Sequence, residues 1–233
     1  MARNFFKKCM NMENGVFDGV GQYGIPQLKG IRAKDFNPNT TWFNFISAVS
    51  QKKDRKDYSV HFFIDDYQFE RCWNALDTYT ALLSQYNYVL TPDFSLYFDM
   101  PKAIQIYNHY RKHYLGAYWQ SRGINVIPTI NWSDESSFEW CFDGEPKHSV
   151  VATSTVGIMK TESLKRTYDK GFNEMLNRLE PSMIIFYGRI PEKWKDCGVK
   201  SIVIPPFYES TIKRSKLQKA IKNIYLKEGG QNG

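Results

Sequence analysis

Seven short apolar stretches, spaced along the chain, constrain the fold more than any other feature of the sequence. Several are continuous runs of β-branched and aromatic residues that do not alternate with polar ones. Such runs are typical of strands covered on both faces, and therefore of a largely parallel sheet with helices outside. The candidate strands are residues 41–47, 58–65, 87–91, 125–132, 149–156, 182–188 and 201–207.

Helix-like segments with an apolar stripe separate most of these strands. They cover residues 65–86, 99–123 and 161–181. Asp65 or Asp66 is the expected N-cap of the first helix and Asp99 of the second, since Asp accepts hydrogen bonds from the free N–H groups of a helix start. Alternating strands and helices indicate the α/β class. Seven strands favour an irregular or incomplete (β/α) barrel with mainly parallel strands; an open parallel α/β sheet is the alternative.

The 233 residues are expected to form a single α/β domain, because barrels of this class often run to about 200–250 residues. Residues 1–40 are rich in Gly, Asn and Pro and are predicted to form an irregular N-terminal wrap. Residues 209–233 are predicted to form a basic amphipathic helix and tail. The net charge of +7 suits anionic partners such as nucleic acid or nucleotides.

Several classes of protein are not supported. The four cysteines form no CxxC pair, so a zinc knuckle is not expected. No GxGxxG follows the first candidate strand and no GxxxxGK[ST] is present, so neither a Rossmann dinucleotide site nor a P-loop is indicated. No apolar run reaches the roughly 18 residues of a membrane helix, and the N-terminus lacks the apolar region of a secretory signal. We therefore expect a soluble cytoplasmic protein with no membrane partner.

Four longer motifs carry a resemblance: VHFFIDDYQFE, TPDFSLYFDMP, GAYWQSRGINVIPTINWSDESSFEWCFDG and VVATSTVG. With them the chain resembles a family of phage and mobile-element proteins catalogued as a domain of unknown function. The resemblance covers about residues 40–190. It implies a bacterial or phage origin, and hence a bacterial host cell as the setting, and it supplies no reaction.

Acidic residues gather where the predicted strands end, which is where parallel α/β folds bind ligands. Asp65 and Asp66 follow the second candidate strand and Asp93 follows the third. Carboxylates that lie together can share a divalent cation or shift each other's pKa, so these three are the candidate catalytic residues and metal ligands. Helix capping is the alternative for Asp65 and Asp66. Asp93 is favoured, because Pro92 forces an extended approach and the aromatic residues that follow would partly desolvate the acid.

Other strand ends offer groups for substrate binding. Trp132 could stack on a base or sugar ring, and Arg189 could hold a phosphate, with Tyr97 as a further aromatic contact. Core packing of Trp132 and an exposed turn at Arg189 are the alternatives. His109 and His113 have the i,i+4 spacing of a metal-binding pair. No carboxylate stands beside them in the sequence and both lie in mid-helix, so metal binding is not favoured there.

Basic residues near the C-terminus are predicted to contact nucleic-acid phosphates, although a solvated helix face is the plain alternative. They are Lys213, Arg214, Lys216, Lys219 and Lys222.

These observations lead to three functional hypotheses. The first is a metal-dependent hydrolase or lyase acting on a phosphorylated or nucleic-acid substrate, in which Asp93 and Asp65 or Asp66 hold a divalent cation that activates water. The second is a non-catalytic phage factor that binds nucleic acid or a host protein through its basic tail. The third is a glycoside-hydrolase-like barrel, which needs two carboxyl groups about 5–10 Å apart.

Overall fold

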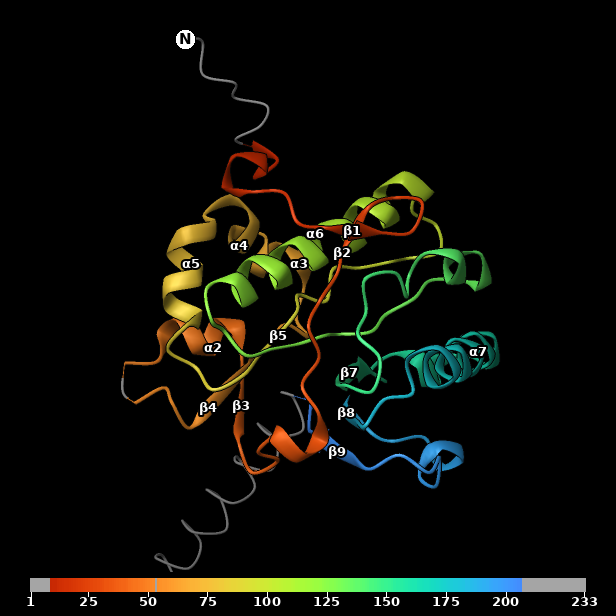
Figure 1. Ribbon diagram of the computed structural model, residues 1–233. Helices are drawn as coiled ribbons and strands as arrows, with labels where there is room; N and C mark the ends of the chain where they lie inside the picture. The colour runs from red at the N-terminus through yellow and green to blue at the C-terminus, as the bar shows by residue number, and fades with distance from the viewer. Residues whose placement is uncertain (1–8, 53, 207–233) are drawn as a thin grey trace, which may run out of the picture.

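The computed structural model describes residues 9–52 and 54–206, and its seven parallel strands lie in two sheets (Figure 1). The first sheet holds β3 (Thr41–Asn44), β4 (Tyr58–His61), β5 (Val89–Leu90) and β6 (Val126–Ile127), in chain order. The second holds β7 (Val150–Ser154), β8 (Met183–Tyr187) and β9 (Ser201–Ile204). Each strand lies within a predicted range, so the prediction of seven strands is confirmed.

The two sheets are connected without closing into a barrel. An isolated parallel bridge pairs Thr129 with Ala152, and the N–H of Ile130 donates to the Ala152 carbonyl at 2.7 Å. Within the described residues no strand pairing joins β9 to β3. The mainly parallel α/β class is therefore confirmed, with open sheets in place of a closed barrel.

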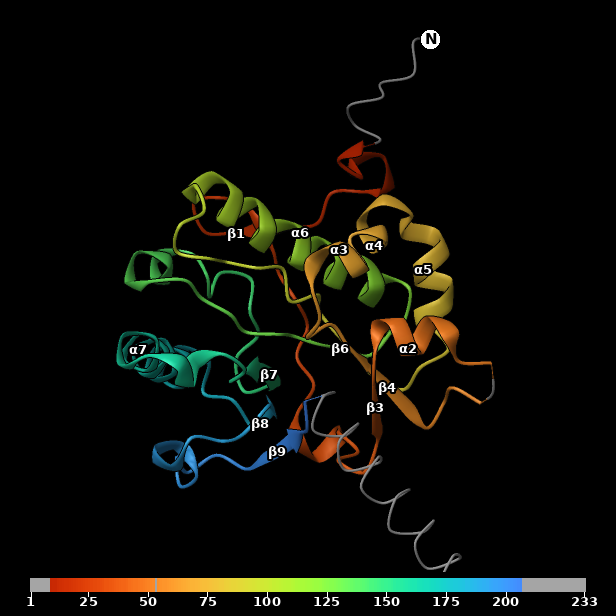
Figure 2. The same ribbon diagram turned by 180° about the vertical axis from the view of Figure 1, so that it is seen from behind.

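Residues 9–40 follow an irregular path against both sheets. They contain η1 (Met12–Asn14), the antiparallel pair β1 (Gly19–Val20) and β2 (Ile25–Pro26), and η2 (Ala33–Asp35). After β2 the chain runs between the two sheets (Figures 1 and 2). There the Ile31 carbonyl accepts from Val150 N of the second sheet, and Phe36 packs on Tyr88 beside the first.

Five helices cover the four-stranded sheet (Figures 1 and 2). They are α2 (Phe45–Ser50), α3 (Asp66–Phe69), α4 (Arg71–Asn74), α5 (Leu76–Leu83) and α6 (Lys102–Ser121). The prediction of one helix over 65–86 is wrong, because three short helices occupy this range. The backbone leaves the helical conformation at Ala75 (φ −133°, ψ 59°), and the Trp73 carbonyl accepts a hydrogen bond from Asn11 Nδ2.

The beginnings of the two long helices differ in how well they were predicted. Pro101 occupies the N-cap position of α6, which no side chain caps, so the assignment of Asp99 as the cap is wrong. Asp99 lies instead in a turn that the Met100 N–H closes on the Tyr97 carbonyl. The other long helix, α7 (Glu162–Leu179), begins at Thr161 as predicted, and Thr161 Oγ1 accepts from Leu164 N at 3.2 Å.

Apolar clusters fill the space between these elements. Phe62, Phe69 and Trp119 belong to the cluster under the helices of the first sheet. α7 packs against the second sheet through Phe172, with η3 (Glu135–Glu139), η4 (Ile158–Lys160) and η5 (Glu192–Trp194) nearby. A third cluster takes residues from both sheets: Leu90, Ile127, Ala152, Ile185 and Ile204. Because this shared cluster holds the sheets together, the carboxyl ends of β5, β6 and β7 form one rim.

Candidate functional site

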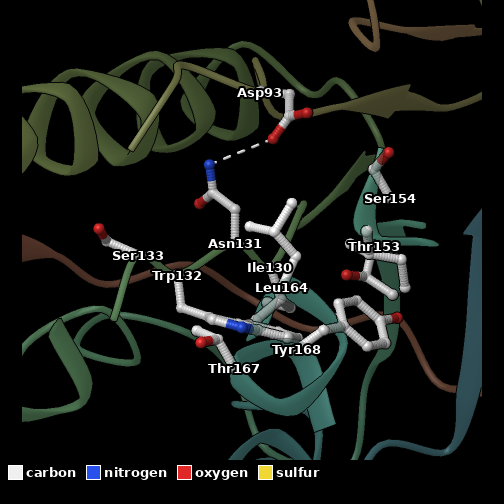
Figure 3. A pocket seen from close by; sticks show the side chains of 11 residues that line it. Asp93, Ile130, Asn131, Trp132, Ser133, Thr153, Ser154, Leu164, Thr167 and Tyr168 are labelled. Carbon is white, nitrogen blue, oxygen red and sulfur yellow. Dashed lines mark hydrogen bonds between the residues drawn. The ribbon is translucent and has the colours of Figure 1, made fainter. Parts of the chain in front are cut away.

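A pocket of about 180 Å³ lies at the carboxyl ends of β5, β6 and β7, at the seam between the two sheets (Figure 3). The first turns of α7 and η4 complete its wall. Asp93, Asn131, Trp132, Ser154 and Tyr168 are among its lining residues. The pocket therefore forms at the edge of the strands where the sequence predicted a site.

Asp93 supplies the pocket's carboxyl group. It is half-buried, and its Oδ1 accepts a hydrogen bond from Asn131 Nδ2 at 3.1 Å (Figure 3). Burial raises the pKa of Asp93 to about 7; Asp66 adds to this rise, whereas Lys112 and the bond from Asn131 oppose it. A carboxyl group with this pKa gains and loses a proton near neutral pH, which suits general acid–base chemistry.

A buried polar network continues inward from Asn131. Asn131 Oδ1 accepts from Lys112 Nζ at 3.1 Å, and the same ammonium donates to the Thr129 carbonyl at 2.9 Å and to Glu145 Oε1 at 2.8 Å. His113 Nε2 lies 2.9 Å from Glu145 Oε1. The side chains of Lys112, His113 and Glu145 are at most 1% exposed. An ion pair this deeply buried needs every partner, because an unpaired charge there is costly.

The charges in this network shift two pKa values in the core. Burial, together with Lys112 and His113, holds the pKa of His109 well below its ordinary value. Burial alone would raise the pKa of Glu145, but Lys112 and His113 more than offset it and lower that pKa. His109 is therefore neutral and Glu145 is ionised at neutral pH.

Trp132 forms the aromatic wall of the pocket. Its ring lies 5.3 Å from that of Tyr168, between centroids, and packs on α7 at Gly171. A Cβ atom at Gly171 would lie 2.2 Å from Trp132 Cε2, so no larger residue fits while the indole stays in place. The wall therefore depends on a close approach between the loop after β6 and α7.

The three predicted carboxylates do not occupy equivalent positions. Asp66 lies close enough to Asp93 to raise its pKa. The Asp66 oxygens accept from Ser95 N at 3.0 Å and Ser95 Oγ at 2.9 Å, which fixes the loop after Asp93. Asp65 is exposed, and its carboxylate accepts from Gln68 Nε2. The fold thus brings Asp66, at the start of α3, against the loop that carries Asp93 and leaves Asp65 outside, and a cation shared by all three stays a prediction.

The remaining predicted residues lie outside the pocket lining. Tyr97 is 61% exposed, in the turn before α6. Arg189 is exposed after β8, where its carbonyl accepts from Thr155 Oγ1 at 2.8 Å, one residue beyond the pocket's Ser154. The predicted nucleic-acid contacts Lys213, Arg214, Lys216, Lys219 and Lys222 lie outside the described residues, so their role stays a prediction.

Sequence reasoning did not identify Lys112, Glu145, Tyr168 or Gly171 as part of this region. The HYRKH motif, residues 109–113, carried one signal, because Lys112 lies between two histidines on a buried helix. Glu145 carried none, since it lies in a turn 32 residues away from His113 in sequence.

Comparisons with known proteins agree with the resemblance noted from the motifs. A family described as a domain of unknown function (DUF4417) matches residues 17–204. The Gene 1 protein of Mycobacterium phage L5 is 38% identical over 180 residues, covering 75% of this chain and 75% of that protein. The Gene 1 protein of Mycobacterium phage D29 is 41% identical over 182 residues, covering 76% of this chain and 67% of that protein. No solved structure matches.

Among the described residues, no helix combines the length and the apolar character that crossing a membrane requires.

Proposed function

Because the chain belongs to the DUF4417 family of phage-related proteins, whose function is unknown, we propose its function from its own pocket: it binds a ring-containing small molecule and exchanges a proton with it through Asp93. The observation that carries this proposal is the position of one half-buried carboxyl group beside an aromatic wall. The reaction class we propose is that of a hydrolase or lyase.

The size and lining of the pocket favour a ring. Apolar cavities of about 150 Å³ take up a benzene ring, and this pocket measures about 180 Å³. Trp132 and Tyr168 offer aromatic surface, which favours a planar ligand. The substrate class that fits is a nucleobase or nucleoside, whose ring would lie against Trp132 and whose polar edge would face Asp93 and Asn131.

Asp93 would act as the general acid or base. A catalytic carboxyl group works best when its pKa lies near the working pH, and that of Asp93 is about 7. Asn131 would hold the carboxyl in place and would itself be held by Lys112. Removing the carboxyl should therefore abolish turnover while leaving ring binding largely intact.

For a phosphate on the substrate we propose Arg189 as the binding residue, because its backbone lies beside Thr155, one residue after the pocket's Ser154. The described lining contributes Asp93 as its carboxyl group, whereas a glycoside hydrolase needs a pair. The pocket therefore favours ring chemistry at one carboxyl over the glycoside-hydrolase hypothesis. Sites that depend on the basic tail, and a cytoplasmic location in the host, stay predictions.

The test is a thermal-shift titration of the full-length protein with free nucleobases, nucleosides and their 5′-monophosphates. A ligand that binds only the folded state raises the melting temperature. We expect at least one member of this panel to raise it in the wild type and in Asp93→Asn, and to lose most of its effect in Trp132→Ala. The hits are then incubated with wild type and Asp93→Asn, and chromatography reports whether the ring is released or altered.

Asp65→Asn is the matched control, because it removes an exposed carboxylate from the neighbouring loop. It should bind and turn over like the wild type. The proposal fails if no panel member shifts the melting temperature, or if Trp132→Ala responds as strongly as the wild type. The catalytic part fails on its own if Asp93→Asn turns over the ligand at the wild-type rate.

A further inference from the structure

A second group of polar side chains lies in the core, separated from the pocket by Lys112 and Asn131. His109 and His113 face Glu145 from one side of α6, and all three side chains are buried. Each residue offers a ligand atom, and these atoms lie within 4.8 Å of one another. Among the residues that the structure describes, no other three side chains drawn from His, Cys, Asp and Glu lie this close together.

Backbone carbonyls orient both imidazole rings. His109 Nε2 lies 3.1 Å from the Asp143 carbonyl, and His113 Nδ1 lies 2.9 Å from the Pro26 carbonyl. A carbonyl oxygen only accepts, so these two nitrogens carry the protons. On a neutral ring His109 Nδ1 then presents a lone pair, whereas His113 Nε2 makes a 2.9 Å contact with Glu145 Oε1 that a metal between the two atoms would replace. Metal-binding histidines are held in the same way, with the second ring nitrogen donating to a carbonyl or carboxylate.

Two polar atoms of the group lack a partner. His109 Nδ1 and Glu145 Oε2 are buried and make no hydrogen bond within the described residues. Buried polar groups are nearly always paired, and each one that is not needs a reason. One nitrogen lone pair and one carboxylate oxygen, both buried without a hydrogen-bond partner, are ligands that a cation would satisfy.

We propose that His109, His113 and Glu145 bind a transition-metal dication, with Zn²⁺ as the best match. Two imidazoles and one carboxylate form a ligand set that zinc accepts at distances of about 2.0–2.2 Å. The site would be structural, because it is closed to solvent and joins α6 to the turn that carries Glu145 and, through Pro26, to the N-terminal segment. It is independent of the proposed function, since Asp93 takes no part in it.

Lys112 opposes the cation and sets how tightly it binds. Its ammonium lies 2.8 Å from Glu145 Oε1, so it already neutralises part of the charge that attracts a metal. It leaves Glu145 Oε2 free, and its other two acceptors, the Thr129 carbonyl and Asn131, hold it on the pocket side. Glu145 Oε2 is therefore the oxygen that we assign to the metal, together with the two histidines.

The experiment measures the metal that co-purifies with the full-length protein expressed in medium supplemented with Zn²⁺. The site is closed, so the metal is loaded during folding. We expect about one Zn²⁺ per chain in the wild type, by elemental mass spectrometry, and its loss in His109→Leu and Glu145→Gln. His148→Asn is the matched control: it removes a largely exposed histidine outside the group and should keep the metal. A wild type that retains no metal, or variants that retain as much as the wild type, would overturn the proposal.

A second measurement uses the wild type alone, so it tests the proposal even where the variants do not fold. Wild type expressed with Co²⁺ should show visible absorption bands of a low-coordinate site without the charge-transfer band of a thiolate ligand, because the proposed ligands are two nitrogens and oxygen. A thiolate band would place the metal on cysteine and overturn the assignment, as would a protein that takes up no cobalt.

Discussion

At the scale of single residues, the fold has its clearest effect on the pKa of Asp93, the carboxyl group of the pocket. Burial raises its pKa from 3.8 to about 7, so between these values the folded protein binds more protons at this site than the unfolded chain does. The contribution of Asp93 to the free energy of unfolding therefore falls as pH rises through this window. The free energy of unfolding of Asp93→Asn should exceed that of the wild type by roughly 2–4 kcal/mol at pH 8, and the two should differ little at pH 4.

Urea denaturation at several pH values measures this difference. Asn retains an oxygen that can accept from Asn131, so the substitution removes the charge and keeps the hydrogen bond. Asp65→Asn serves as the control for removing a carboxylate from the same side of the molecule. A difference between Asp93→Asn and wild type that is the same at pH 4 and pH 8 would contradict a buried, proton-binding Asp93.

At the scale of elements, the contact between α7 and the loop after β6 positions the aromatic wall. Replacing Gly by Ala inside a helix normally stabilises the protein by about 1 kcal/mol. At Gly171 we expect the opposite sign, a loss of about 1–3 kcal/mol, because the new methyl group would overlap the indole of Trp132. Thermal or urea unfolding of Gly171→Ala measures the loss, and the variant should also bind pocket ligands more weakly.

The double variant Gly171→Ala with Trp132→Ala separates overlap from other effects. Removing the indole gives the methyl group room, so the cost of Gly171→Ala should disappear in this background, and the helix preference for Ala should emerge. A cost that is unchanged without Trp132 would show that the overlap is not its cause.

The sequence predicted elements where the pattern is local, and missed features that depend on distant contacts. The apolar runs identified all seven strands of the two parallel sheets, and Thr161 identified the start of α7, because a strand covered on both faces and a helix cap leave signatures in neighbouring residues. The break in residues 65–86 involves Asn11, which bonds to the Trp73 carbonyl from 62 residues away. Such a contact leaves no trace in the local pattern.

The same reason explains which parts of the candidate site were predicted. Asp93 and Trp132 follow strands, and parallel strands place their carboxyl ends together, so both could be expected at one rim. Glu145 joins His113 from a turn, and its partner Lys112 is a charged residue in the middle of a buried helix face. Lysine is almost never fully buried unless it is paired, so composition alone argued against finding it there.

At the scale of the whole molecule, the segment after β2 couples the two sheets. It runs between them, and Ser149, the residue before β7, holds it in place: Ser149 Oγ accepts from Ile31 N at 3.0 Å. Tyr88 Oη, beside β5, donates to the Asp35 carbonyl and accepts from Asn37 N. The segment thus bonds to the second sheet at one end and to the first at the other.

Ser149→Ala tests this coupling. Ser149 is 1% exposed, and the substitution leaves the half-buried Ile31 N–H without this partner, which should cost about 1 kcal/mol. Ser84→Ala is the control, because the exposed Ser84 hydroxyl makes a local bond to the Ala81 carbonyl; it should change stability by less than about 0.5 kcal/mol.

Hydrogen exchange shows whether the two sheets open together. If the segment makes them one cooperative unit, Ser149→Ala lowers protection equally at Val60 in β4 and Ile185 in β8. Lower protection at Ile185 alone would mean that the second sheet opens by itself and that the segment does not couple the two.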